Sequence, residues 1–324
     1  MNTIKSELLQ YGIPFEENVS LKKKTWIKTG GIVSLWITPK GVEQLKKTIV
    51  LLKSGDIEFE LVGHTSNLYY LNNYNPKVII STRNVSQFVE NEDCIECACG
   101  APSSSVSRYC VERGYTGYSG LVNLPGTVGA AIHNNSSCFD CSISEHLIDC
   151  VFYDLDRNEE VCLNPNDFDF AYRTSKLKKK ELRGVLLSLR LDKKQGVAGM
   201  EIAKAARATQ IRKTTQETSA YTLGSVYAGL IPRDNVLAKM TQVGGGEKIL
   251  KMCNLYTKRR YIRLMLTLYG FSDIKDFVSD RVINTFKWLP NRNDTNEKFK
   301  RYQQFIEKAY KEPKLEIEIR DGNR

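Results

Sequence analysis

Residues 120–131 contain small residues at a spacing that would let the backbone come close to an anion. They read Gly-Leu-Val-Asn-Leu-Pro-Gly-Thr-Val-Gly-Ala-Ala, so a Pro-Gly turn at Pro125 and Gly126 is followed three residues later by Gly129. Glycine has no Cβ and adopts positive φ readily, which lets N–H groups approach a large anionic ligand. Because Pro-Gly also marks ordinary turns, the segment indicates a bound cofactor only in combination with other motifs.

The elements that would position this loop are predicted by hydrophobic periodicity. A second candidate ligand loop, Gly63-His64-Thr65-Ser66-Asn67, follows directly after a predicted strand. After Gly196 the pattern changes to a long helix and then to helices rich in Arg, Lys and Tyr, so we expect a domain boundary there. The predicted strands cover 32–37, 58–62, 78–81, 94–99, 148–155, 185–191 and 314–320, and the predicted helices cover 42–53, 103–113 and 198–214. The chain therefore reads as α+β.

Length and charge narrow the class of protein. A chain of 324 residues with 41% hydrophobic composition can bury a sizeable core and should form two or three domains. The net charge of +10 comes from scattered basic clusters, which predicts a solvated basic surface that attracts phosphate-bearing small molecules and not nucleic acid. The longest apolar stretch near the C-terminal half, 261–271, contains Arg263 and is too short to cross a membrane. Without a targeting signal at residues 1–11, we expect the cytoplasm.

The cysteines and histidines give no metal signature. Nine cysteines in a chain without a signal peptide are typical of reduced thiols. Cys94 and Cys97 have metal-like spacing, as do Cys138 and Cys141, but the strand predicted at 94–99 turns the first pair to opposite faces. We therefore predict no metal site. Of the three histidines, two are outside the candidate loops: His133 is expected to be packed and His146 to lie at the surface.

Several short motifs combine into the pattern of a known family. They are Thr25-Trp26-Ile27-Lys28-Thr29-Gly30-Gly31, Gly63 to Leu68, Pro125 to Ala131 with Asn135, Ala171-Tyr172-Arg173-Thr174-Ser175, Thr215-Gln216, Gly224-Ser225-Val226 and Leu315 to Arg320. In this order they resemble the UDP-N-acetylenolpyruvoylglucosamine reductases over roughly residues 10–235 and 297–320, and the combination is specific. The resemblance implies the two-subdomain FAD-binding fold of the vanillyl-alcohol oxidase (PCMH) type at 1–80 and 81–196, followed by a smaller α+β substrate domain at 197–324.

The resemblance also implies an activity and a cofactor site. This family reduces the enolpyruvyl ether of a nucleotide sugar to a lactyl ether in peptidoglycan precursor synthesis, with FAD as cofactor and NADPH as hydride donor. By the family's pattern, backbone N–H groups at 63–67 and 125–129 would hold the FAD pyrophosphate. The implied cofactor-binding residues are Gly30, Gly31, Gly63, His64, Thr65, Ser66, Asn67, Pro125, Gly126, Thr127, Gly129 and Asn135.

Three further positions match the family's catalytic residues. Arg173 would polarise the substrate carboxylate, Ser225 would donate a proton, and Glu318 would assist at the same carbon. Glu316 would replace Glu318 if the strand register were shifted by two, because both residues lie on one face of a strand. Tyr172 is expected to pack and not to react.

The departures from the family's pattern fall on the substrate side and leave alternatives open. Residues 240–296 have no family counterpart, with a candidate hinge or loop at 242–246, and Ala228 and Gly229 replace the usual Asn-Pro. The chain could thus be a reductase of this or a related enolpyruvyl sugar, or a flavin-binding paralogue without the activity. A third alternative is a sugar or alcohol oxidase, because Gly-His-Thr at His64 resembles the segment where some flavoproteins attach FAD covalently. The oligomeric state is left open.

Overall fold

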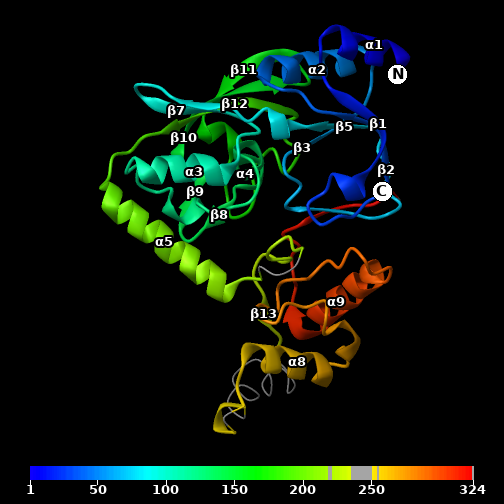
Figure 1. Cartoon of the computed structure of the whole chain (residues 1–324), viewed down its shortest axis with the longest axis vertical. Helices are drawn as coiled ribbons and strands as arrows, with labels where there is room; N and C mark the ends of the chain where they lie inside the picture. The colour runs from blue at the N-terminus through cyan, green and yellow to red at the C-terminus, as the bar shows by residue number, and fades with distance from the viewer. Residues whose placement is uncertain (218–220, 235–249, 254, 323–324) are drawn as a thin grey trace. The chain divides into compact units, whose positions relative to one another are not determined.

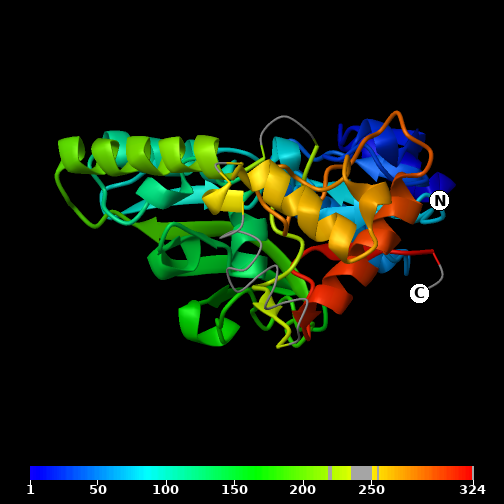
Figure 2. The ribbon, with the colours of Figure 1, turned by 90° about the horizontal axis from the view of Figure 1, so that it is seen from below.

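The computed structural model describes residues 1–217, 221–234, 250–253 and 255–322 (Figure 1). The chain divides into two compact units. The first unit comprises residues 1–23, 31–66 and 74–210, and the second comprises 24–30, 67–73 and 211–324. The division near the middle of the chain falls within helix α5 (Ala198–Thr215), which Figure 2 shows as one continuous helix.

A four-stranded sheet in the first unit carries the first candidate loop. Its strand order is β1-β2-β5-β3, with β1 antiparallel to β2 and the other neighbours parallel. The bounds are β1 Phe15–Ser20, β2 Ile32–Ile37, β3 Glu60–Val62 and β5 Val78–Ser81. Helix α2 (Val42–Ser54) links β2 to β3 and buries Leu45, Ile49 and Leu52, whose spacing puts them on one helical face. Helix α1 (Asn2–Gln10) buries Ile4 and Leu8 in the same core.

A five-stranded antiparallel sheet completes the first unit. Its order is β11-β10-β12-β7-β6, with β6 Phe88–Glu90, β7 Cys94–Ala98, β10 Leu147–Asp154, β11 Glu159–Leu163 and β12 Gly184–Asp192. Helices α3 (Ser103–Glu112) and α4 (Val128–Asn134) bury Val106, Val128 and Ile132 in the core that both sheets share (Figure 1). The hairpin of β8 (Ser137–Cys138) and β9 (Cys141–Ser142) follows α4.

The second unit is built around an aromatic core. The rings of Trp288 and Phe286 pack edge to face, and both contact Phe299. Its helices α8 (Lys258–Leu268) and α9 (Thr295–Ala309) bury their apolar faces in this core. Its strands are short: β4 Leu68–Tyr70 pairs in parallel with β15 Glu318–Arg320, and β13 Ile231–Pro232 pairs with β14 Tyr310–Lys311.

Most predicted elements are confirmed to within one or two residues. The strands at 32–37 and 78–81 are confirmed at both ends, whereas the strand at 58–62 begins only at Glu60. The terminal strand predicted over 314–320 is shorter, at 318–320, because Leu315 instead forms an isolated bridge with Tyr227. The predicted domain divisions at residues 80 and 196 stay predictions, and the first of them falls within β5.

Two predictions about single side chains are wrong. His146 is buried and not at the surface, because its ring stacks on Tyr118 and its Nδ1 lies 2.8 Å from an Asp192 carboxylate oxygen. Tyr172 is 71% exposed and not packed, because it stands at the tip of a turn.

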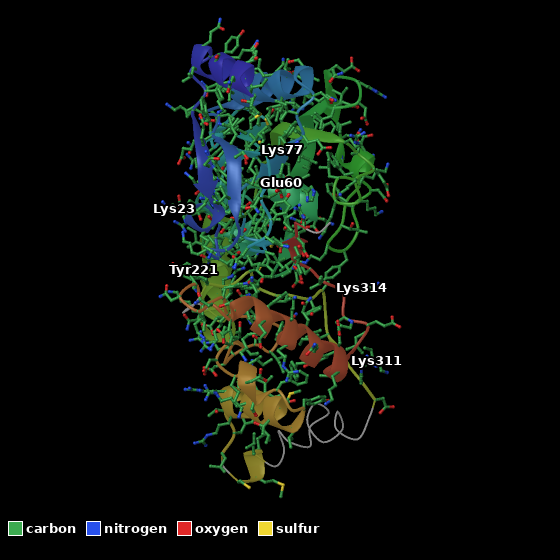
Figure 3. All side chains as sticks on the ribbon, turned by 90° about the vertical axis from the view of Figure 1, so that its right-hand side faces the viewer. Lys23, Glu60, Lys77, Tyr221, Lys311 and Lys314 are labelled. Carbon is green, nitrogen blue, oxygen red and sulfur yellow. The ribbon has the colours of Figure 1, made fainter. Side chains whose placement is uncertain are left out.

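Basic side chains occur in both units. Figure 3 shows Lys23 and Lys77 on separate segments of the first unit, and Lys311 and Lys314, which follow α9, in the second. Within the described ranges, no helix is long and apolar enough to span a bilayer. The same ranges hold no group of three or more side chains suited to bind a metal.

Candidate active site

In the first unit, each of the two glycine-containing loops packs a glycine against a side chain of the other loop. A Cβ at Gly63 would lie 2.7 Å from Thr127 Oγ1, closer than real Cβ atoms approach, and 3.1 Å from its methyl carbon. Gly126 has φ +110°, and a Cβ there would lie 3.2 Å from Ser66 Oγ. Any side chain at 63 would therefore force the Thr127 side chain or the loop that carries it to shift. The motifs at 63–66 and 125–129, which are far apart in sequence, form one feature of the structure.

The second of these loops is fixed to the five-stranded sheet. The Gly129 N–H donates to the Cys99 carbonyl over 2.8 Å, and a Cβ at Gly129 would lie 2.9 Å from that oxygen. The Val128 N–H donates to Ala101, and Thr127 Oγ1 accepts from the Ala130 N–H at the start of α4. Glycine is thus required at 129 by close packing, and the loop is held rigidly before any ligand binds.

The adjoining loops leave backbone donors available to an anion. Within the described part of the chain, the N–H groups of His64, Ser66 and Gly126 donate to no protein acceptor. Buried or half-buried N–H groups normally find a partner, so their ligand is expected to supply acceptor oxygens. A pyrophosphate has such oxygens and carries no donor of its own, and the FAD pyrophosphate therefore fits these residues.

Arg83 is a charged residue beside this loop that sequence reasoning missed. Its Nη2 donates to the His64 carbonyl over 3.1 Å, and burial lowers the pKa of its guanidinium, which is half-buried. Strands β3 and β5 are parallel, so their carboxyl ends share an edge, and Arg83 follows β5 where the His64 loop follows β3. Its place after a buried apolar strand was the available signal.

His64 itself is half-buried, and its pKa is lowered by burial and then by the nearby Arg83 charge. Its imidazole is accordingly neutral near pH 7, since the ordinary value is about 6.5. Thr65, the next residue, has φ +57° and is buried. The backbone of this loop is therefore held in a left-handed conformation that non-glycine residues seldom adopt.

Arg173 stands on a tight turn anchored to the helix that follows the second loop. Ala171 and Thr174 exchange backbone hydrogen bonds of 3.2 and 3.0 Å, leaving Tyr172 and Arg173 at the tip, with Arg173 at φ +56°. Asn135 Nδ2 donates to the Ala171 carbonyl over 2.7 Å. The turn that carries Arg173 is thereby tied to the end of α4.

Asn135 also closes α4, in a left-handed conformation with φ +44°. Its Oδ1 accepts from Ser144 Oγ over 2.5 Å and from Ser142 Oγ over 3.2 Å. Its side chain thus connects three segments of the first unit, which makes it a positioning residue in this structure. A direct contact with the cofactor stays a prediction.

In the second unit, Ser225, Asn67 and Glu318 lie on neighbouring backbone segments. The Glu316 N–H donates to the carbonyl of Val226, next to Ser225, and the Glu318 N–H donates to Asn67, both over 2.9 Å. Asn67 Nδ2 reaches the Glu316 carbonyl at 3.2 Å. Ser225 is exposed, and the Glu318 carboxylate forms an ion pair with Arg320 at 2.8 Å. These residues share one strand cluster, while Arg173 belongs to the first unit.

The structure gives less evidence on the remaining predicted cofactor-binding residues and on the divergent segment at 240–296. Gly30 has φ +114°, and the Gly31 carbonyl accepts from Leu21, so their part in holding a cofactor stays a prediction. The loop predicted at 242–246 lies outside the described residues. Within the described part of 240–296, α8 turns Arg259 and Arg263 toward Asp280, at 3.4 and 3.5 Å. These arginines are engaged in surface ion pairs.

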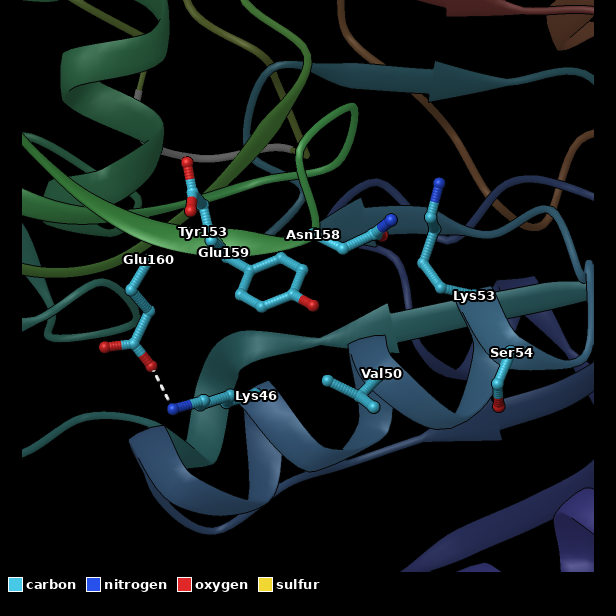
Figure 4. A pocket seen from close by; sticks show the side chains of 8 residues that line it. All are labelled: Lys46, Val50, Lys53, Ser54, Tyr153, Asn158, Glu159 and Glu160. Carbon is cyan, nitrogen blue, oxygen red and sulfur yellow. Dashed lines mark ion pairs between the residues drawn. The ribbon is translucent and has the colours of Figure 1, made fainter.

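An open cavity of about 810 Å³ lies away from all predicted site residues, between α2 and the β10–β11 hairpin (Figure 4). An ion pair joins Lys46 to Glu160 across it. Its lining is Lys46, Val50, Lys53, Ser54, Tyr153, Asn158, Glu159 and Glu160. It offers neither of the glycine loops nor any predicted catalytic residue.

Comparison with known proteins decides the family. A family model described as a FAD binding domain matches residues 33–153, which include strands of both sheets and the two glycine loops. A UDP-N-acetylenolpyruvoylglucosamine reductase from Caldicellulosiruptor saccharolyticus is 30% identical over 239 residues, 74% of this chain and 76% of the relative. The chain belongs to the UDP-N-acetylenolpyruvoylglucosamine reductase family.

Further members of the reductase family agree. A reductase of the same name from Aquifex aeolicus is 24% identical and covers 84% of this chain and 91% of its own length. The crystal structure of the Thermus caldophilus reductase superposes with a TM-score of 0.68 at 16% identity, over 95% of this chain and 100% of that one. The family resemblance, the α+β fold class and FAD as the cofactor are confirmed.

Proposed function

We propose that this chain is a reductase that uses NADPH and FAD to reduce the enolpyruvyl ether of UDP-N-acetylenolpyruvoylglucosamine to a lactyl ether. The observation that carries the proposal is the junction of Gly63 with Thr127, where two loops present unpartnered N–H groups in a chain of this family. The relatives named for this activity cover about three quarters of their own lengths in the match. A cytoplasmic location, a nucleotide-sugar substrate and the absence of a nucleic-acid partner stay predictions.

The residues of the first unit would bind the cofactor and the substrate carboxylate. FAD held there would supply the hydride that adds to the enolpyruvyl double bond of the substrate. The N–H groups of His64, Ser66 and Gly126 would hold its pyrophosphate, and Arg83 would add positive charge beside them. Arg173 would stabilise the negative charge that hydride addition places next to the carboxylate, on a turn held by Asn135.

The second unit would supply the proton. A serine hydroxyl is a weak acid, so Ser225 can act only if its position is fixed and the resulting alkoxide is reprotonated at once. The hydrogen bonds of Val226 to Asn284 and Glu316 fix its backbone. Glu318 would assist from the neighbouring strand, with Arg320 fixing the orientation of its carboxylate. Glu316 occupies the alternative register position.

Two other functions remain as test outcomes. A flavin-binding paralogue would bind FAD and lack turnover, although retention of Arg173, Ser225 and Glu318 argues for activity. An oxidase would hold FAD through His64, whose neutral imidazole is the nucleophilic form. Acid precipitation separates the last case, because covalent flavin stays with the precipitated protein.

Product analysis tests the proposal. The holoenzyme is incubated with NADPH and UDP-N-acetylenolpyruvoylglucosamine, and the nucleotide sugar is analysed by mass spectrometry. We expect the mass of the lactyl ether, larger by two hydrogen atoms. Unchanged substrate beside an intact flavoprotein would support the paralogue and overturn the proposed reaction.

A further inference from the structure

The hairpin after α4 places two cysteines directly opposite each other. Cys138 in β8 pairs with Cys141 in β9, across a loop of only Phe139 and Asp140. Opposed residues of an antiparallel pair point to the same face, with Cα atoms about 4.5–5.5 Å apart. A disulfide needs Cα atoms about 4.4–6.8 Å apart. Both cysteines are half-buried and neither is in a disulfide, so the pair is close enough to be joined and open enough to be oxidised.

The loop that brings these thiols together is strained. Phe139 and Asp140 have φ +49° and +58°, the left-handed conformation that a two-residue turn of this kind requires at both positions. Asn and Gly favour such positions, and a bulky residue there is an outlier. Strained backbone persists only where the surrounding structure imposes it. The pairing of the two cysteines across the hairpin is therefore held by the fold.

Contacts with Gly120 hold the hairpin in place. A Cβ at Gly120 would lie 2.3 Å from the Cys138 carbonyl and 3.0 Å from Cys141 Sγ. Burial raises the pKa of the Cys141 thiol, and the neighbouring Gly120 backbone and Ser119 side chain act in the opposite direction. Ser142, the next residue, bonds to Asn135. The pair thus lies between the turn at 119–121, which leads to the second glycine loop, and the residue that anchors the Arg173 turn.

We propose that Cys138 and Cys141 are a redox modification site, which a peroxide converts to an intramolecular disulfide. One thiolate attacks a peroxide oxygen, the O–O bond breaks, and a sulfenic acid and water form when the oxidant is hydrogen peroxide. The second thiol displaces hydroxide from that sulfur, the S–S bond forms, and a second water leaves. The two sulfurs have then lost two electrons to the peroxide.

The geometry makes this disulfide readily reversible. Opposed residues in a sheet have Cβ atoms about 4.5–5.5 Å apart, whereas a disulfide prefers about 3.5–4.5 Å. Closing the bond must therefore tighten a hairpin that already packs against Gly120. Strained disulfides are the easily reduced ones. A metal is disfavoured, since these two thiols have no third ligand among the described residues.

Peptide mapping tests the site without depending on activity. Holoenzyme treated with hydrogen peroxide is alkylated, digested without reduction and analysed by mass spectrometry. We expect the loss of two of the nine free thiols, a cross-link between Cys138 and Cys141, and return of both thiols with dithiothreitol. Exposed Cys162 provides a matched control, since Cys162→Ser should leave the cross-link unchanged.

The opposite results are equally clear. If Cys138 and Cys141 stay alkylatable while Cys162 oxidises, or if either joins another cysteine or a second chain, the proposal is overturned. Cys141→Ser should abolish the cross-link and leave Cys138 open to sulfinic acid. Should that variant fail to fold, the mapping of the unsubstituted protein decides.

Discussion

Thr127 Oγ1 lies where a Cβ on residue 63 would be only 2.7 Å away, so Gly63 and Thr127 together set the distance between the two glycine loops. The N–H groups available to an anion lie on those same two loops. The spacing of the proposed pyrophosphate donors is thus fixed by one glycine and one threonine. It follows that cofactor affinity should be sensitive to a single methyl group.

Gly63→Ala should weaken FAD binding. The added methyl would push the loops apart and misplace the donors, and we expect the dissociation constant to rise about tenfold or more, equivalent to about 1.4 kcal/mol. Titration of apoprotein monitored by flavin fluorescence measures it. Gly199→Ala is the matched control, because a Cβ there meets no atom within 4 Å. Equal affinities for Gly63→Ala and unsubstituted protein would refute the role of this contact.

Arg173→Ala should slow only the half-reaction that involves the substrate. Loss of a charged group from a developing negative charge typically costs about 10²–10³-fold in rate. Stopped-flow measurements should show flavin reduction by NADPH unchanged and reoxidation by the enolpyruvyl sugar slowed by that factor. Arg183→Ala, at a largely exposed ion pair with Asp156, should change neither rate. Equal slowing of both half-reactions would contradict the assignment.

Ser225→Ala should likewise spare flavin reduction while lowering the rate of substrate reduction by about 10²-fold or more, the range of general acid catalysis. Glu318→Gln should also lower this rate, and Glu316→Gln should not. Ser272→Ala, at an exposed serine, is the control. If Glu316→Gln is the damaging substitution, the two glutamates exchange roles.

Asn135 offers a test of backbone strain and side-chain bonding in one position. Asn135→Gly removes the hydrogen bonds to Ala171 and Ser144, each worth about 0.5–1.5 kcal/mol, and keeps the left-handed backbone free of strain. Asn135→Ala loses the same bonds and adds about 1 kcal/mol of strain. Urea unfolding should therefore rank stability as unsubstituted, then glycine, then alanine. An alanine variant more stable than the glycine variant would contradict this.

His64 should make stability depend on pH. Its pKa is lowered in the folded state, so the unfolded chain binds more protons as the pH falls below about 6.5. The free energy of unfolding should then decrease from pH about 7 toward lower values, and it should do so less in His64→Gln. Urea unfolding of the apoprotein at several pH values measures the difference. Identical pH profiles for the two proteins would show that His64 contributes nothing.

The sequence predicted those elements and loops whose pattern lies within a single short segment. The alternation at 32–37 predicted β2, and the glycines at 63 and 126 marked the two loops. Sequence reasoning failed where distant residues decide. Arg83 reaches His64 only because β3 and β5 are parallel neighbours. His146 is buried only because its ring stacks on Tyr118 and its Nδ1 pairs with the Asp192 carboxylate. No local pattern encodes such partners.

The terminal strand shows the same limit. Its alternation over 314–320 predicted one strand, yet Leu315 bridges to Tyr227 while Glu318 pairs with Leu68. Because Tyr227 and Leu68 come from distant parts of the sequence, the segment that local periodicity predicts as one strand pairs in two places. The same division places Glu318 beside Asn67, a relation that residue spacing alone could not predict.

An anaerobic titration of the flavoprotein with NADPH, followed by UDP-N-acetylenolpyruvoylglucosamine, tests the proposed reductase most directly. We expect the visible flavin absorbance to bleach with NADPH and to return when the enolpyruvyl sugar is added. Bleaching that persists after the sugar is added, or a protein that binds no flavin, would contradict the account.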